Sequence, residues 1–324
     1  MRAIVARAFG GPEVLELQNV PDPMPGPTQV LVHVHTVGVN PYDTYMRTGN
    51  YAIKPPLPYT PGSDAAGVIA AVGSDVNDVA LGARVFIGGT ATHKAYGAYA
   101  EKVVCERGQI HPLPGRLSFA QGAAINVPYV TAWRALHIRG RIQPGETLFI
   151  HGASGSVGIA ATQIARAWGL TVIGTAGTTA GLELVLAQGA AHALNHREPD
   201  YLDRLKELTD GRGPDVILEN LANVNLDNDL TALAFGGRIV VVGNRGRIEI
   251  DPRKTMSKEG AIVGMALWNT TPDEWTKIYR ALHAGLSDGT LSPHVAMELP
   301  LGDAGQAHQR ILEPAANGKI VLTL

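Results

Sequence analysis

The sequence contains a single cysteine, Cys105, in 324 residues. One cysteine cannot form a disulfide within the chain, and it cannot supply a zinc lobe built from four cysteines. The chain also lacks a run of about 18 apolar residues, the length that a membrane-spanning helix needs. Its first residues run directly into a strand-like pattern without an apolar leader, so we expect no secretory signal. These absences predict a soluble protein of the cytoplasm.

The chain has no strong excess of charge, and its formal net charge is −2 at pH 7. Neither a basic run nor an Arg-Gly tract occurs, so nucleic acid or an anionic membrane is not the expected main partner. The composition is 45% hydrophobic with 38 glycines and 21 prolines. This composition is typical of a compact α/β protein with many tight turns, and the length is sufficient for two domains.

The first part of the chain, residues 1–123, has the pattern of a small β domain. Residues 30–37 and 67–73 are strand candidates, and many prolines and glycines separate such segments. Several short strands with this punctuation predict a partly closed β-barrel. A helical stripe then follows over residues 122–139, and we expect Pro128 to interrupt it.

Residues 124–268 alternate between strand and helix candidates, which predicts βαβ units and a parallel sheet with helices on its faces. Strand candidates occur at 148–151, 170–174, 191–194, 215–219, 238–242 and 261–265. Helix candidates occur at 156–168, 181–188, 200–209 and 225–234. The last segment, 269–324, contains two further helix candidates and a final strand at 320–324, and we expect it to return to the first domain.

The strongest local motif is the glycine-rich turn between the first strand and the first helix of this alternating region. Read against the pattern G-x-G-x-x-G, it has Ala153, Gly155 and Gly158 at the glycine positions. Gly155 would let the backbone approach a pyrophosphate closely, and Gly158 would let the helix lie against the strand. The N–H groups at the start of the helix would face the phosphates. The turn therefore predicts a dinucleotide-binding site.

The segment after the second strand of this region indicates which dinucleotide is bound. An NAD site has Asp or Glu there to bind the ribose 2′-hydroxyl, whereas residues 174–179 contain no carboxylate. Donors for a 2′-phosphate are available from Asn195, His196 and Arg197, which follow the third strand candidate. We therefore predict NADPH rather than NADH as the cofactor.

The sequence as a whole resembles the zeta-crystallin type of NADPH:quinone oxidoreductase in the medium-chain dehydrogenase/reductase superfamily. The resemblance runs nearly end to end and rests on matched blocks at residues 10–15, 38–41, 58–64, 121–124, 151–158, 195–198 and 221–226. It implies a GroES-like barrel domain and a Rossmann domain. The sequence differs from the family pattern in one place. Some relatives have a lysine after the second strand, where this chain has Thr178, Thr179 and Ala180.

The resemblance also implies the cofactor contacts. Thr131 matches a position beside the nicotinamide, and His196 and Arg197 match the neighbourhood of the 2′-phosphate. The remaining implied contacts are Tyr51, Ser154, Gly155, Ser156, Val157, Gly177, Asn225, Val242, Gly243, Asn244, Arg245, Met265, Ala266 and Leu267.

No metal site is expected. Zinc-dependent relatives carry a cysteine in the block that contains Asn40, and a Gly-His-Glu block where this chain has Gly62, Ser63 and Asp64. Neither Asn40 nor Ser63 is a normal zinc ligand. Polarisation of a carbonyl must then come from neutral donors, and the resemblance places Asn40 and Tyr45 beside the substrate. We predict that these two residues bind a quinone oxygen, and that the substrates include ortho-quinones.

Three questions remain open at this level. The same cofactor site would serve a 2-alkenal or enoyl reductase, for which Tyr45 or Tyr51 could donate the proton. Relatives of this type have also been recruited as lens crystallins, and some bind RNA, so a non-enzymatic role is a further alternative. The residues do not separate hydride transfer from one-electron transfer. Relatives pair through the Rossmann sheet edge, so we expect a homodimer or homotetramer that uses residues 261–267.

Overall fold

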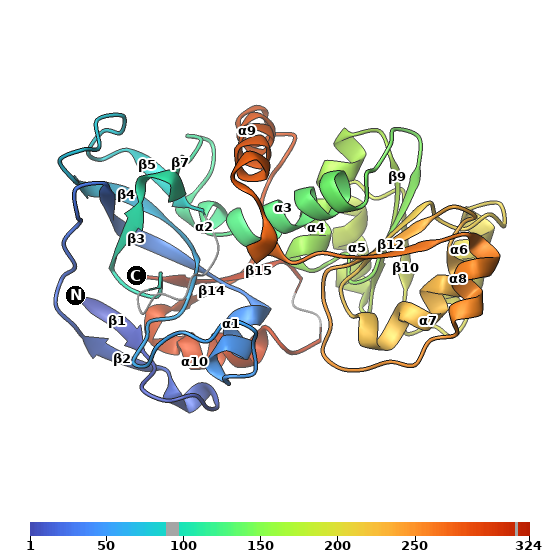
Figure 1. Cartoon of the computed structure of the whole chain (residues 1–324), viewed down its shortest axis with the longest axis horizontal. Helices are drawn as coiled ribbons and strands as arrows, with labels where there is room; N and C mark the ends of the chain where they lie inside the picture. The colour runs from blue at the N-terminus through green and yellow to red at the C-terminus, as the bar shows by residue number, and fades with distance from the viewer. Residues whose placement is uncertain (89–96, 315–316) are drawn as a thin grey trace. The chain divides into compact units, whose positions relative to one another are not determined.

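The chain divides into two compact units, each described here by itself (Figure 1). The computed structural model describes residues 1–88, 97–314 and 317–324. Unit 1 comprises Met1–Val127 and Pro293–Leu324, and unit 2 comprises Pro128–Ser292. Unit 1 is therefore built from both ends of the chain.

Helix α9 (Pro272–Asp288) explains why unit 2 extends beyond residue 268, the boundary drawn from the sequence. Glu274 on α9 accepts a hydrogen bond from Nε of Arg134 over 3.0 Å, which ties the helix to unit 2. The apolar face of α9 is buried along Ile278, Leu282 and Leu286. Because these contacts are far apart in sequence, the local pattern of the helix gave no sign of the unit that receives it.

Unit 1 is organised around one long, bent strand, β3 (Gln29–Val39). The described sheet runs in the order β14 (Val295–Pro300), β15 (Lys319–Thr323), β3, β4 (Asp64–Val72), β5 (Arg84–Ile87) and β7 (Ile110–Pro112), and β6 (Lys102–Glu106) also pairs with β3. The other elements are β1 (Arg2–Val5), η1 (Pro12–Val14), β2 (Glu16–Asn19), α1 (Pro41–Arg47), η2 (Arg107–Gln109), α2 (Phe119–Gly122), η5 (Leu301–Asp303) and α10 (Ala304–Arg310). The last strand thus lies antiparallel to β3.

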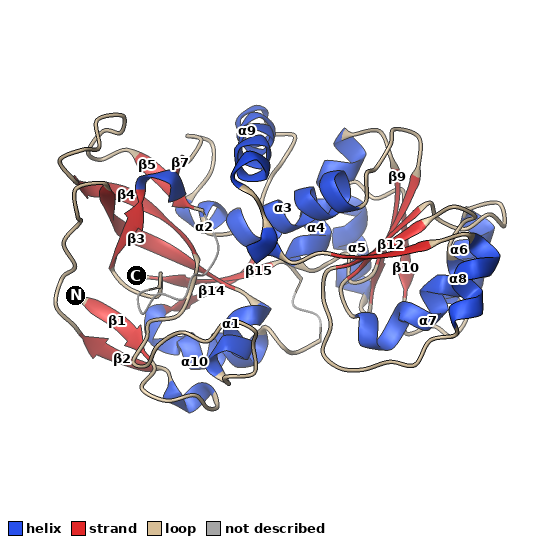
Figure 2. Cartoon of the chain, viewed as in Figure 1, coloured by secondary structure: helices blue, strands red, loops and turns tan. Residues whose placement is uncertain are grey.

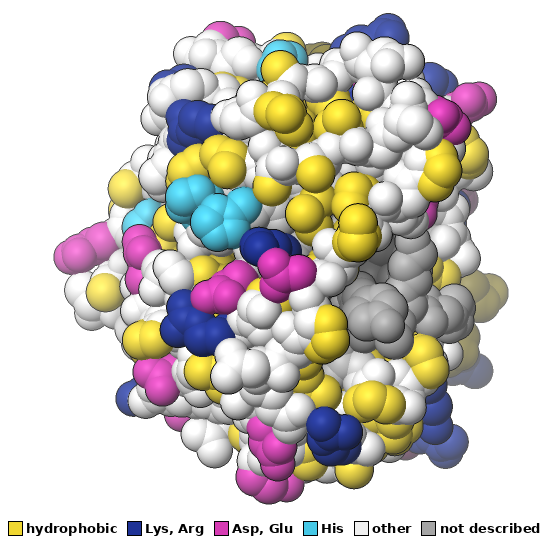
Figure 3. Space-filling view, turned by 90° about the vertical axis from the view of Figure 1, so that its left-hand side faces the viewer, with side chains coloured by type: hydrophobic (Ala, Val, Ile, Leu, Met, Phe, Trp, Pro, Cys, Tyr) yellow, Lys and Arg dark blue, Asp and Glu magenta, His cyan; other side chains and the backbone are white. Residues whose placement is uncertain are grey.

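Strand β3 buries one face and exposes the other. Its buried positions include Val30, Val32 and Val34, which belong to the hydrophobic core of unit 1. His33 and His35 point the other way, with ring centroids 5.5 Å apart, and His35 also stacks on Phe119. Histidine side chains gather at one place on the face of unit 1 shown in Figure 3. The alternation follows from the two-residue period of a strand.

Unit 2 contains a six-stranded parallel sheet within its fully described residues, 128–292. The strand order is β10 (His192–Asn195), β9 (Thr171–Ala176), β8 (Thr147–Ile150), β11 (Val216–Glu219), β12 (Arg238–Val241) and β13 (Ala261–Gly264). Every pairing is parallel, so all six strands end at the same edge of the sheet. The order reverses next to β8, which is where doubly wound sheets bind ligands.

Helices cover both faces of this sheet (Figure 2). One side carries α4 (Ser156–Ala167) and α5 (Thr179–Ala187), and the other carries α6 (Tyr201–Leu208), α7 (Ala222–Ala232) and α8 (Pro252–Lys258). η4 (Leu267–Asn269) follows β13. The central strand β8 is buried at all four positions, as expected for a strand covered on both faces. No helix of the described chain is long and apolar enough to cross a membrane.

The prediction that Pro128 interrupts a helix was wrong. Helix α3 (Asn126–Trp133) begins two residues before Pro128 and continues into the π-helical segment η3 (Arg134–Arg139). Pro128 therefore lies in the first turn, where backbone N–H groups have no partner within the helix. A missing N–H costs nothing at that position.

Candidate functional site

The glycine-rich turn joins β8 to α4 and is fixed by β9. Ala153 N–H donates to the carbonyl of Thr175 over 2.8 Å, and Gly152 N–H donates to its hydroxyl over 3.0 Å. Gly152 has a φ of +64°, a left-handed conformation that favours glycine. Helix α4 then starts after Gly155 with no side-chain cap. The N–H groups of its first turn are thus available to an anion.

The two later glycines of the turn have different steric roles. A Cβ on Gly158 would lie 2.5 Å from Cα of Ala153, so this glycine permits close packing of α4 against the turn. The atom nearest to a Cβ on Gly155 would be the carbonyl oxygen of Gly152, at 3.4 Å, which is an ordinary contact distance. The protein alone therefore requires glycine at 158 but not at 155. A phosphate close to the backbone is the reason that remains for Gly155.

Replacing each of these glycines by alanine separates the two roles. Gly158→Ala is expected to lower the free energy of unfolding by about 1–3 kcal/mol, because the backbone contact forces α4 outward. Gly155→Ala is expected to change stability by less than about 0.5 kcal/mol and to weaken NADPH binding at least tenfold. Thermal unfolding and fluorescence titration with NADPH measure the two quantities. Unchanged NADPH affinity in Gly155→Ala would remove that glycine from the site.

Gly177, His196 and Arg197 come together at the ends of β9 and β10. A Cβ on Gly177 would lie 2.8 Å from Nε2 of His196 and 2.9 Å from Nε of Arg197. Both residues are exposed, but the His196 imidazole is partly desolvated, and this desolvation together with the charges of His151 and Arg197 lowers its pKa. The structure thus groups two donors around a turn that has no carboxylate, which is the arrangement that a 2′-phosphate requires.

The other predicted cofactor residues of unit 2 follow the same edge of the sheet. Val242–Arg245 follow β12, Met265–Leu267 follow β13, and Asn225 lies in α7 after β11. Val242 and Gly243 are held by β11, because both N–H groups donate to the carbonyl of Glu219 over 2.9 and 3.2 Å. Thr131 is buried in α3.

In unit 1, Asn40 is part of a buried polar network. Asn40 is 1% exposed, and its Oδ1 accepts a hydrogen bond from Nζ of Lys319 over 2.6 Å. Its Nδ2 donates to Oδ2 of Asp64 over 3.0 Å, and Lys319 donates to the same oxygen over 2.7 Å. Asn126 and the backbone of Val127 bind the other oxygen of Asp64. Among the described residues, only Asp64 accepts a hydrogen bond from the side-chain amide of Asn40, so one N–H of Nδ2 is left over.

Lys319 reaches Asn40 because the sheet leaves room for it. Strand β15 pairs with β3, so the two ends of the chain meet at this point. A Cβ on Gly38 would lie 2.7 Å from Cε of Lys319, and glycine there lets the lysine side chain pass. The ammonium group is fully buried and ends between two oxygen atoms.

Tyr45 and Tyr51 are both half-buried, with ring centroids 6.3 Å apart. Tyr45 lies on α1, which begins directly after Asn40. Tyr51 also stacks on Tyr42 with ring centroids 5.9 Å apart. Burial, aided by the charges of Asp43 and Tyr45, raises the pKa of Tyr51 to about 12. Tyr51 therefore keeps its proton at neutral pH and can act as a hydrogen-bond donor.

The residues around Asn40 do not form a zinc site. Ser63 hydrogen-bonds to the hydroxyl of Tyr42, and Asn40 is held by Lys319. The ammonium group of Lys319 is already paired with the carboxylate of Asp64 and would repel a divalent cation.

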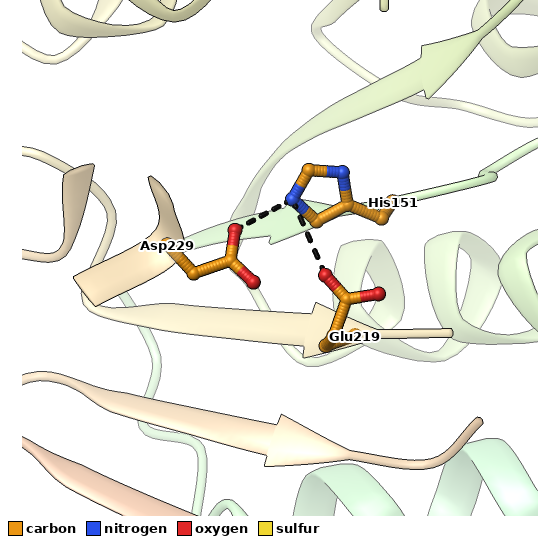
Figure 4. A group of neighbouring side chains, drawn as sticks. All are labelled: His151, Glu219 and Asp229. Carbon is orange, nitrogen blue, oxygen red and sulfur yellow. Dashed lines mark hydrogen bonds and ion pairs between the residues drawn. The ribbon is translucent and has the colours of Figure 1, made fainter. Parts of the chain in front are cut away.

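In unit 2, one group among the described residues brings together side chains of types that can bind a metal ion, namely His151, Glu219 and Asp229 (Figure 4). Their ligand atoms lie within 4.8 Å of one another.

Sequence reasoning missed the residues that support these sites. Lys319 and Asp64 lie 255 residues apart, so no local pattern links them. One signal was present in each case, because a charged residue adjoins an apolar strand run. Lys319 precedes the final strand candidate, and Glu219 closes the strand candidate at 215–219. A charge at the edge of a buried strand requires a partner.

Comparison with known families matches both units. Residues 26–115 match the family described as alcohol dehydrogenase GroES-like domain, and residues 156–284 match the family described as zinc-binding dehydrogenase. These matches confirm the predicted fold class, a GroES-like domain together with a Rossmann-type parallel sheet.

Relatives match over the whole chain. Human quinone oxidoreductase is 48% identical over 326 residues, which cover 100% of this chain and 98% of the relative. The solved structure of Escherichia coli quinone oxidoreductase complexed with NADPH has a TM-score of 0.90 at 31% identity, with 100% of both chains covered. A structure described as an NAD-dependent alcohol dehydrogenase has a TM-score of 0.93 at 31% identity and the same coverage.

Proposed function

The chain belongs to the zeta-crystallin-type quinone oxidoreductases of the medium-chain dehydrogenase/reductase superfamily, and we propose from this membership that it reduces quinones with NADPH. The observation that carries the proposal is the edge of the unit 2 sheet. An uncapped helix start, a glycine without a steric reason of its own, and two donors beside a carboxylate-free turn lie along that edge. When bound, NADPH supplies the reducing equivalents from its nicotinamide.

The acceptor side of the reaction is assigned to unit 1. We propose that Tyr45 offers its hydroxyl to a quinone oxygen and that Asn40 offers its remaining N–H. Lys319 and Asp64 hold the two ends of the Asn40 amide, so its orientation is fixed before a substrate arrives. A fixed donor needs no reorganisation when charge develops on the acceptor oxygen. A quinone needs little further activation, because its reduction restores an aromatic ring.

The proposal includes no zinc. The side-chain oxygens of Asn40 and Ser63, the two residues at the zinc-ligand positions of relatives, are already hydrogen-bonded to Lys319 and Tyr42 and do not fit a divalent ion. Elemental analysis of the purified protein tests this point, with less than about 0.1 zinc per chain as the expected result.

NADPH oxidation in the presence of a small substrate panel tests the function. The panel contains an ortho-quinone, a para-quinone and a 2-alkenal, and NADH is run alongside NADPH. We expect turnover of the quinones with a preference for NADPH. Turnover of the 2-alkenal alone would favour the reductase alternative, and NADPH binding without any quinone turnover would contradict the proposal.

We also propose that the protein is a cytoplasmic homo-oligomer. Strand β13 is the outer strand of the unit 2 sheet, and Ala261, Ile262 and Gly264 on it are exposed. An exposed edge strand is a ready site for pairing with a second copy. Analytical ultracentrifugation should give a dimer or tetramer, and Ile262→Lys should shift the protein toward monomer.

Cell fractionation tests the proposed location in the cytoplasm.

A further inference from the structure

Three buried acid and base side chains converge next to the phosphate-binding turn (Figure 4). His151 directly follows β8, Glu219 ends β11, and Asp229 lies in α7. Nε2 of His151 lies 2.7 Å from Oδ1 of Asp229 and 3.5 Å from Oε2 of Glu219. We call these three residues the acid cluster.

The acid cluster has too little positive charge for its two carboxyl groups. No lysine or arginine of unit 2, which is described throughout, forms an ion pair with Glu219 or Asp229. Oε2 of Glu219 and Oδ2 of Asp229 are buried without a hydrogen-bond partner among the described residues. Two neighbouring buried carboxylates cannot both be ionised without a large free-energy cost. The cluster must therefore hold at least one proton.

Burial and mutual repulsion keep this proton on the cluster near neutral pH. They raise the pKa of Glu219 to about 8, and burial raises the pKa of Asp229 to about 7. Burial lowers the pKa of His151, so the imidazole does not neutralise the carboxyl groups. The other titratable groups facing the cluster are Tyr201 on α6 and His196 after β10. The pKa of Tyr201 is raised, so it stays neutral.

The acid cluster also ties together three segments that are assigned to the cofactor. Asn220 Nδ2 donates to the carbonyl of His151, the residue before the glycine-rich turn, over 2.8 Å. Oε1 of Glu219 accepts hydrogen bonds from the backbone of Leu221 and from Nδ2 of Asn225. The carbonyl of Glu219 holds the N–H groups of residues 242 and 243. A change in the charge of the Glu219 carboxylate acts directly on Leu221 and Asn225, and the backbone of the same residue is bonded to the segment that follows β12.

We propose that His151, Glu219 and Asp229 form a proton-holding cluster whose protonation sets the affinity of the enzyme for NADPH. The inference rests on the phosphate-binding role of the glycine-rich turn and not on quinone reduction. While the cluster holds its protons, it adds little negative charge near the phosphates. As pH rises through about 7 to 8, the cluster loses protons and its charge opposes the phosphate charges. NADPH affinity is therefore high near pH 7 and falls as pH rises toward about 9.

Fluorescence titration with NADPH at several pH values tests the proposal. Between about pH 7 and pH 9 we expect the wild-type dissociation constant to rise about tenfold. The double variant Glu219→Gln/Asp229→Asn keeps the cluster neutral, because an amide imitates a protonated acid. It should abolish most of this rise and retain the tight binding of the wild type at pH 7. Ionisation of the 2′-phosphate, with a pKa of about 6, is nearly complete below this window.

Asp227→Asn is the matched control. Asp227 lies on the same helix, two residues before Asp229, but its carboxylate is partly exposed and paired with Lys254. The pKa of Asp227 is lowered by that pairing, so the group is already ionised across the whole window. The control variant should follow the wild-type pH profile.

A measurement on the wild type alone guards against variants that do not fold. Calorimetric titration with NADPH near pH 8, in buffers of different ionisation enthalpy, counts the protons taken up on binding. We expect net uptake, because bound phosphates favour the protonated cluster. No uptake, equal pH slopes in wild type and the double variant Glu219→Gln/Asp229→Asn, or one equivalent of a tightly bound metal ion would each overturn the proposal. None of these results would bear on quinone turnover.

Discussion

Replacing Lys319 by methionine is expected to lower the free energy of unfolding by about 3–5 kcal/mol. Methionine is close to lysine in length, so the change removes the charge with little change in packing volume. It leaves the carboxylate of Asp64 buried and without a cation, although Asn40 and Asn126 still donate to it. Chemical denaturation followed by circular dichroism measures the loss.

Two further variants separate the buried charge from other effects. Lys319→Met combined with Asp64→Asn removes both charges and should recover most of the lost stability. Lys102→Met removes a lysine whose partner, Asp22, is half exposed, and should cost less than about 1 kcal/mol. A double variant as unstable as the single one would mean that Lys319 acts through packing rather than through its charge.

Replacing Asn40 by alanine is expected to lower quinone turnover by about 10²-fold, the usual cost of losing one donor to a developing oxyanion. The dissociation constant for NADPH should stay unchanged, because the cofactor is assigned mainly to unit 2. Lys319 and Asp64 remain paired in this variant, so the sheet around them is retained. Steady-state kinetics with a quinone and fluorescence titration with NADPH give the two values.

Asn126→Ala is the matched control for Asn40→Ala. Its amide donates to the same carboxylate, Asp64, over 3.0 Å, so the two variants disturb one network in similar ways. Asn126 is not assigned to the acceptor, and its loss should lower stability while turnover is largely kept. Equal losses of turnover in both variants would show that the network acts only through the fold and would remove Asn40 as a donor.

Much of the fold follows from local patterns. The strands of unit 2 are short apolar runs bounded by glycine and charged residues, and each lies within two residues of its predicted position. The glycine-rich turn and the absence of a carboxylate after β9 are also local, so the cofactor side of the site could be predicted. The prediction for Pro128 was wrong because the effect of a proline depends on where the helix begins, and a proline in the first turn does not interrupt a helix.

The supporting residues of both sites depend on tertiary structure. Asn40 and Lys319 are 279 residues apart and meet only because β15 pairs with β3. His151 and Asp229 are 78 residues apart and meet because β8 and β11 are neighbours in the sheet. Periodicity predicts which face of a strand is buried, but not which buried polar groups will face one another. The burial of Glu219 and Asp229, and hence the raised pKa of each, could therefore not be predicted from the sequence.

Unit 1 takes residues from both ends of the chain, and this arrangement constrains how the protein is made. During synthesis Asp64 emerges long before Lys319, and the whole of unit 2 is translated between them. Unit 2 can fold as a continuous segment while unit 1 still lacks β15 and the cation for its buried carboxylate. Unit 1 therefore stays incompletely folded until the final strand leaves the ribosome.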